Sequence, residues 1–117
     1  MTINIIIDTL KYLKLYRNIM EEISVQDLKE KKFATIIDVR TKEEYNRGHV
    51  PGAKHHELAD LEKWSSKLKK DKEYYFICRS GARSGVACIQ LKSKGFSKCF
   101  NITGGTMAWI NEGYDIE

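Results

Sequence analysis

Residues 74–91 read YYFICRSGARSGVACIQL. The run from Tyr74 to Cys78 is short, apolar and rich in aromatic side chains, which predicts a buried strand. The segment 79–84 is small and basic, and it leads into a helix that Gly95 ends. Cys78 is therefore predicted to lie at a strand-to-helix junction, directly ahead of a tight loop.

The segments before this junction show the same alternation. Residues 34–39 read ATIIDV, a β-branched apolar run that is typical of a parallel strand buried on both faces. Helix starts are predicted at Ser24 and Thr41, each of which heads a sequence that resembles a capping box. The second of these helices is predicted over 41–47, with Gly48 as the left-handed residue that ends it.

The segments on either side of the junction continue this pattern to the end of the chain. A helix is predicted over 60–70, where Leu61 and Trp64 share one face. A last strand is predicted over 98–102, and a terminal helix around 107–111. Strands that alternate with helices in this way predict an α/β fold.

The composition indicates one ordered domain. The chain has 117 residues, of which 42% are apolar and 31% charged, and it contains a single proline. A chain of this length forms one core, and the absence of long polar or repetitive tracts excludes a linker-rich or disordered protein. The formal charge of +4 is spread along the chain, and its densest basic stretch, KLKKDK at 67–72, is typical of the solvent face of a helix. No nucleic-acid partner is expected.

Residues 1–20 are predicted to form a helical N-terminal extension, because Ile6, Leu10 and Leu13 lie near helical spacing. The apolar run is interrupted by Asp8 and is far shorter than the about 20 residues that span a bilayer. We expect this helix to pack on the body of the protein or on a second copy. Contact with a membrane surface is the less favoured alternative.

The three cysteines and the histidines predict neither a disulfide framework nor a metal site. The cysteines are odd in number and widely spaced, and no secretory signal precedes them, so a cytoplasmic protein is expected. Cys88 should lie roughly 9 Å along its helix, too far to bridge Cys78, so we expect Cys88 and Cys99 to be packing residues. The histidines and glutamate between 49 and 57 match no zinc-ligand spacing.

The loop after Cys78 favours an ionised thiol. Small residues let successive N–H groups of 79–84 turn inward and form an anion-binding concavity, and the following helix adds the positive end of its dipole. Arg79 and Arg83 add positive charge. In such settings the pKa of a cysteine falls from about 8.5 to between about 3.5 and 7.5. We therefore expect Cys78 to be a nucleophile; the alternative is an inert cysteine at the end of an apolar strand.

Three stretches of the chain resemble the single-domain rhodaneses, sulfurtransferases that carry sulfur as a cysteine persulfide. They are IIDVRTKEEYNRGHVPGA at 36–53, CRSGARS at 78–84 and NITGGTMAW at 101–109. The resemblance covers most of residues 21–117 and implies a rhodanese-like domain over that span. It implies a central parallel sheet of about five strands with helices on both faces. The reactive cysteine would head a loop at the carboxyl edge of the sheet, where ligands bind in open parallel sheets.

The resemblance also implies roles for individual residues. Cys78 would take the outer sulfur of thiosulfate or a persulfide donor and pass it to a thiophilic acceptor. Asp38 and Arg40 would brace the active loop, and the glycine pair at 104–105 is expected to allow a close backbone approach. The residues implied in donor binding are Arg79, Ser80, Gly81, Ala82, Arg83 and Ser84.

Within that loop, Arg83 and Arg79 would recognise the oxygens of the donor, because a guanidinium group meets an oxyanion through two parallel hydrogen bonds. The partners implied are a small anionic sulfur donor and a protein sulfur donor or acceptor. No cofactor is implied.

Two other functions stay open at this point. Cysteine-dependent phosphatases related to this fold keep one more residue between cysteine and arginine than the four that separate Cys78 from Arg83. A rhodanese-like module that binds or regulates a partner without turnover often lacks the cysteine or the basic loop, and this chain retains both. Both differences favour a sulfurtransferase.

Overall fold

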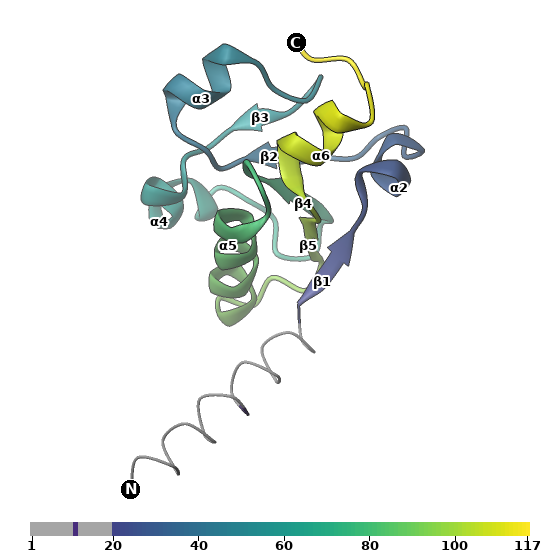
Figure 1. Cartoon of the computed structure of the whole chain (residues 1–117). Coiled ribbons are helices and arrows are strands. Elements are labelled where there is room, and N and C mark those ends of the chain that lie inside the picture. Colours follow the sequence, from purple (N-terminus) through teal and green to yellow (C-terminus); the bar gives the residue numbers. More distant parts are fainter. Residues whose placement is uncertain (1–10, 12–19) are drawn as a thin grey trace, which may run out of the picture.

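The computed structural model describes residue 11 and residues 20–117. Its centre is a five-stranded sheet in the order β1-β5-β4-β2-β3, in which each pair of neighbouring strands is parallel (Figure 1). The predicted α/β class and the sheet of about five parallel strands are confirmed. The strands are β1 (Glu21–Ile23), β2 (Ile36–Asp38), β3 (Lys54–His55), β4 (Tyr74–Ile77) and β5 (Cys99–Ile102).

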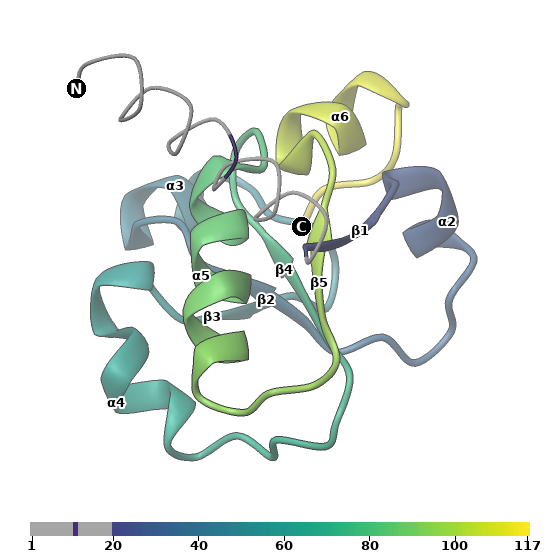
Figure 2. The same cartoon turned by 90° about the horizontal axis from the view of Figure 1, so that it is seen from below.

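Helices cover both faces of the sheet, as predicted. Helices α4 and α5 lie on one face, and α2 and α6 lie together on the other (Figure 2). Helix α3 follows β2 and precedes β3 in the chain. The helices are α2 (Val25–Lys29), α3 (Lys42–Arg47), the 3-10 turn η1 (Leu58–Asp60), α4 (Leu61–Ser65), α5 (Ala82–Ser93) and α6 (Gly105–Asn111).

The central strand β4 divides its side chains between the two faces. Tyr74 and Phe76 join the core cluster under α4 and α5, whereas Tyr75 and Ile77 join the cluster under α2 and α6. All four are buried, because a parallel strand covered on both faces has no solvent side. Cys78 continues the first series and is 1% exposed, so it is buried in the cluster under α4 and α5.

Both predicted helix starts are confirmed. The Ser24 hydroxyl accepts the Asp27 N–H at 3.0 Å. At Thr41 the capping box is complete, because its hydroxyl accepts the Glu44 N–H and the Glu44 carboxylate accepts the Thr41 N–H. Gly48 ends α3 with a positive φ of 146°, although outside the left-handed helical region that was predicted.

Two features of the secondary structure differ from the expectation. The helix predicted over 60–70 is shorter, and α4 ends at Ser65 because the backbone then changes to a tighter turn in which the Leu68 N–H donates to the Ser65 carbonyl. The sequence pattern predicted three of the five strands, β2, β4 and β5. Strands β1 and β3 have only three and two residues, too few to show an alternating pattern.

The prediction of a helical extension over 1–20, packed on the protein or on a membrane surface, falls almost wholly outside the described residues. Among the helices in the described part, none has both the length and the apolar character that a bilayer crossing requires.

Candidate active site

The carboxyl ends of β2, β4 and β5 meet at one edge of the sheet. Because β4 lies between β5 and β2, the residues at the ends of these strands become neighbours. Cys78 directly follows β4, Asp38 is the last residue of β2, and Arg40 lies two residues further on. Strand β5 delivers Asn101 and leads through Gly104 into α6. Three segments that are distant in the sequence therefore surround one thiol.

The sulfur of Cys78 lies within a ring of hydrogen-bond donors. The Gly81 N–H lies 3.1 Å from the sulfur, and the Ser84 hydroxyl lies 3.3 Å from it. The N–H groups of Ser80 and Ser84 also interact with the sulfur. Gly81 has a φ of 109°, a conformation that favours glycine and that lets the loop turn its N–H groups inward. The loop is thus shaped to hold an anion.

These donors lower the pKa of Cys78. Burial acts in the opposite direction and raises the pKa of the thiol, because it disfavours the charged form. The hydrogen bonds from the Ser84 hydroxyl and from the N–H groups of Ser84, Gly81 and Ser80 outweigh burial, so the net pKa of Cys78 is lowered. The thiolate is therefore stabilised by the loop itself.

The start of α6 holds the loop carbonyls away from the sulfur. The Thr106 N–H and hydroxyl donate to the Cys78 carbonyl at 2.9 and 3.0 Å, and the Met107 N–H donates to the Arg79 carbonyl at 3.0 Å. A Cβ at Gly105 would collide with the Cys78 carbonyl oxygen and lie 2.7 Å from the Arg79 carbonyl. The close backbone approach expected here is confirmed, and only glycine permits it.

Asn101 links the loop to β5, and our sequence reasoning did not single it out. The Ser84 Oγ lies 2.5 Å from the Asn101 Oδ1, and the Asn101 Nδ2 donates to the Gly81 carbonyl at 3.0 Å. Since Ser84 has one hydroxyl proton, the Asn101 carbonyl and the Cys78 sulfur compete for it. A buried amide in a short apolar strand is the signal that could have identified this residue.

Asp38 and Arg40 form a buried ion pair beside the loop. The Nε and Nη2 atoms of Arg40 donate to the two Asp38 carboxylate oxygens at 2.8 to 3.0 Å. Arg40 Nη2 also donates to the Gly48 carbonyl at 2.8 Å. The pair connects the end of β2 to the end of α3. That it braces the active loop stays a prediction.

The two loop arginines have different surroundings. Arg83 donates from Nη1 and Nη2 to the two carboxylate oxygens of Glu44, at 2.7 and 2.8 Å. Arg79 is exposed and lines a groove beside the loop. Ser80 and Ala82 are exposed, and Ser80 reaches the sulfur through its backbone N–H. The structure thus separates two arginines to which the sequence assigned the same role.

The groove beside Arg79 combines cationic and apolar side chains. Its cationic members are Arg40, Arg47 and Arg79. The apolar members are Met107, Ile110 and Ile116, which are 45%, 54% and 39% exposed. The carboxylate of Glu44 also lines this groove.

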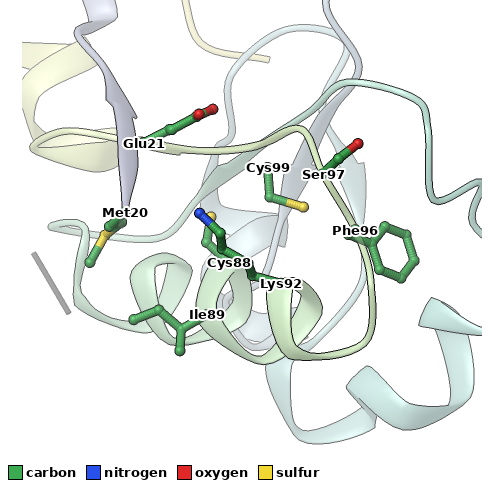
Figure 3. Close-up of a pocket in the computed structure, with 8 residues that line it drawn as sticks. All are labelled: Met20, Glu21, Cys88, Ile89, Lys92, Phe96, Ser97 and Cys99. Atoms are coloured by element: carbon green, nitrogen blue, oxygen red, sulfur yellow. The ribbon is translucent and has the colours of Figure 1, made fainter. Parts of the chain in front are cut away.

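Cys88 of α5 and Cys99 of β5 line one pocket, and no residue of the sulfur ring is among its lining residues (Figure 3). Both are buried, and burial raises the pKa of the Cys88 thiol and raises the pKa of Cys99 to about 12. The three cysteines are free thiols. The packing roles expected for Cys88 and Cys99 are confirmed by their places in the core cluster.

The histidine-rich segment is explained by packing. The His49 ring stacks on Tyr45 with ring centroids 3.8 Å apart, and its Nδ1 lies 3.1 Å from the Tyr45 carbonyl oxygen. His55 stacks on the same ring at 4.7 Å. Within residue 11 and residues 20–117, no group of three or more histidine, cysteine or acidic side chains is arranged to hold a metal ion.

Comparison with known proteins agrees with this geometry. The Rhodanese-like domain family matches residues 22–112. The chain belongs to this family. YtwF of Bacillus subtilis (strain 168) is 46% identical to the rhodanese-like chain over 97 residues, which cover 80% of this chain and 93% of YtwF.

Two further comparisons agree with this assignment. A sulfurtransferase of Allochromatium vinosum is 33% identical over 91 residues, covering 78% of this chain and 85% of that protein. The crystal structure of a rhodanese-like domain protein from Staphylococcus aureus superposes with a TM-score of 0.74 at 33% identity, covering 84% of this chain and 99% of the other. The family membership expected from the three motifs is confirmed.

Proposed function

We propose that this rhodanese-like domain is a sulfurtransferase that moves a sulfane sulfur from thiosulfate or a persulfide donor to a thiophilic acceptor, through a persulfide on Cys78. The observation that carries the proposal is the ring of donors around the Cys78 sulfur. These donors favour the ionised form of the sulfur, and a thiolate is the nucleophilic form of cysteine.

In the first step the Cys78 thiolate attacks the outer sulfur of the donor. A sulfur–sulfur bond forms at Cys78 while the donor's own bond to that sulfur breaks, and the departing sulfite or thiol keeps the bonding electron pair. The new outer sulfur is anionic, and the inward N–H groups of Ser80 and Gly81 suit it as hydrogen-bond donors.

In the second step the acceptor's nucleophile attacks the outer sulfur of the Cys78 persulfide. The sulfur–sulfur bond breaks again, and the Cys78 thiolate returns to the ring of donors in which it began. The sulfur donor oxidises the thiolate and the acceptor reduces it, so the cycle closes without a further redox partner. The acceptor in this proposal is a small thiol or a protein.

The surroundings of the site suit an anionic donor and a reducing compartment. Arg79 and Arg47 give the groove a positive field that attracts anions. A mechanism that depends on one thiolate among three free thiols works where thiols stay reduced. We propose that the activity is cytoplasmic.

Intact mass spectrometry tests the proposal. Wild-type protein incubated with thiosulfate or glutathione persulfide should gain one sulfur atom, and cyanide should remove it. Cys78→Ser should gain none, whereas the matched variant Cys88→Ser should behave like wild type. An unchanged wild-type mass with both donors would contradict the proposal, and release of phosphate from an aryl phosphate would favour a phosphatase instead.

A further inference from the structure

The guanidinium group of Arg83 is already occupied by a side chain of the protein. Its two terminal nitrogens bind the two oxygens of Glu44, in the same fork-to-fork geometry with which arginine binds an oxyanion. Residues 44 and 83 come from α3 and α5. A side chain that the sequence predicted to bind the oxygens of a donor is thus held by an internal carboxylate.

Glu44 is itself fixed in place at the start of α3. Its Oε1 accepts hydrogen bonds from the Thr41 hydroxyl at 3.1 Å and from the Thr41 N–H at 3.3 Å. The hydrogen bond from Arg83 is the largest influence on this carboxyl and lowers its pKa to about 2. Glu44 is therefore ionised at neutral pH, where its carboxylate can bind Arg83.

Ion pairs within the protein reduce the positive charge that is available to bind a donor near Cys78. Asp38 offsets the charge of Arg40, and Glu44 offsets that of Arg83. In the described part of the chain, Arg79 has no ion-pair partner. Thiosulfate is a compact dianion whose oxygens require several donors, and the Glu44 carboxylate repels it. A thiol persulfide carries at most one charge at its reactive end and has no oxygens there.

We propose that Glu44 is a specificity-determining residue that, by holding Arg83, makes thiol persulfides better sulfur donors than thiosulfate. The inference rests on the proposed function of Cys78 and narrows its donor class. The apolar side of the groove, formed by Met107, Ile110 and Ile116, supports the same choice, because it offers a surface for the organic group of a persulfide. Glu44 acts through Arg83 and takes no part in sulfur transfer itself.

In the favoured reaction the Cys78 thiolate attacks the outer sulfur of R–S–SH. The bond between the two donor sulfurs breaks, and RS⁻ departs with the electron pair. The proton of the outer sulfur passes to RS⁻, so the products are RSH and the ionised Cys78 persulfide.

The variant Glu44→Gln tests the proposal directly. Glutamine retains the capping box at the start of α3 but carries no charge to hold Arg83. We expect kcat/KM for thiosulfate to rise by about tenfold, equivalent to about 1.4 kcal/mol, while kcat/KM for glutathione persulfide changes by less than about threefold. The matched control is Glu43→Gln, which removes the same charge from an exposed neighbour in the same helix and should change neither value. Equal changes with both donors would overturn the proposal.

The double variant Glu44→Gln/Arg83→Ala shows whether the gain passes through the arginine. The increase with thiosulfate should disappear in it, since the guanidinium group that Glu44→Gln releases is no longer present. An increase that survives would mean that Glu44 acts only as a general negative charge, which would overturn the proposed route.

A binding measurement separates this inference from the proposed function. Sulfate is an unreactive oxyanion, and its occupation of the site should slow alkylation of Cys78 by iodoacetamide. The sulfate concentration that halves this rate should be about tenfold lower in Glu44→Gln than in wild type or Glu43→Gln. If no donor adds sulfur to Cys78 but sulfate protects Glu44→Gln at a lower concentration than the other two proteins, the proposed function is wrong and the control of Arg83 by Glu44 stands. If sulfate protects all three proteins equally, the inference about Glu44 is wrong and the proposed function is unaffected.

Discussion

Cys78 and the pair formed by Cys88 and Cys99 are the same kind of side chain in opposite surroundings. All three are buried, at 1%, 4% and 9% exposure. Around Cys78 the N–H groups and a hydroxyl outweigh burial and lower its pKa, whereas burial dominates at Cys88 and Cys99 and raises the pKa of both. Burial alone therefore does not decide whether a thiol is reactive.

The three thiols differ because only the backbone around Cys78 has N–H groups that are not already bonded within a helix or the sheet. Cys88 lies in the middle of α5 and Cys99 in β5, where backbone N–H groups bond to other backbone carbonyls of the helix or sheet. Cys78 lies between β4 and α5, where the loop and the first turn of a helix leave N–H groups without such partners. A thiolate supplies the acceptor that those groups lack.

The largest expected effect is on the alkylation rates of the three thiols. At neutral pH Cys78 should react with iodoacetamide at least about a thousandfold faster than Cys99, whose pKa of about 12 leaves it almost wholly protonated. The Cys78 rate should rise with pH through a midpoint below the ordinary thiol pKa and then level off. Peptide mapping after timed alkylation measures each site, and similar rates at all three would break the comparison.

The second effect concerns the backbone that builds the sulfur ring. Gly105→Ala should lower the free energy of unfolding by roughly 2–5 kcal/mol, because a left-handed conformation and a collision with the Cys78 carbonyl add together. Gly113→Ala is the matched control, since Gly113 also has a positive φ of 77° but a Cβ there meets no atom within 4 Å. It should cost about 1–2 kcal/mol. Equal losses in urea denaturation would show that α6 does not press on the loop.

The third effect isolates one donor. Ser84→Ala removes the hydroxyl near the sulfur and should raise the pKa of Cys78, because that hydrogen bond favours the charged thiolate. Ser80→Ala is the control, because Ser80 contributes its backbone N–H, which alanine retains. The pH dependence of the alkylation rate gives both values, and equal shifts in the two variants would contradict the role of the hydroxyl.

The smallest effect is expected at the inert thiols. Cys99→Ala removes one buried atom and should lower the free energy of unfolding by about 1 kcal/mol, with no change in the pKa of Cys78. A change in the alkylation profile of Cys78 would show that the two regions are coupled, and would weaken the separation on which the comparison depends.

The sequence predicted the elements that depend on neighbouring residues. The caps at Ser24 and Thr41 were correct, since each joins groups three residues apart. The prediction of the β4–loop–α5 junction was correct, because an apolar run and a loop of small residues can be recognised from neighbouring residues alone. The length of α4 was wrong, and β1 and β3 were not located, because short elements owe their stability to the sheet around them.

The site was predictable only in part. Cys78 and its loop form one continuous stretch, so their proximity follows from the chain itself. The partner of Arg83 was not predictable, because Glu44 lies 39 residues away and either loop arginine fitted the same role. Asn101 was missed for the same reason, at 17 residues from Ser84.

Amino-acid order alone was enough to establish a parallel α/β domain with a thiol at a strand-to-helix junction, since apolar runs, caps and glycines act within a few residues. Only the tertiary structure decided which residues surround that thiol. The start of α6, 28 residues away at Thr106, turns the Cys78 carbonyl outward, and Glu44 binds one arginine while Arg79 faces the groove. Those contacts depend on which strands become neighbours, and sheet order is a property of the whole packed chain.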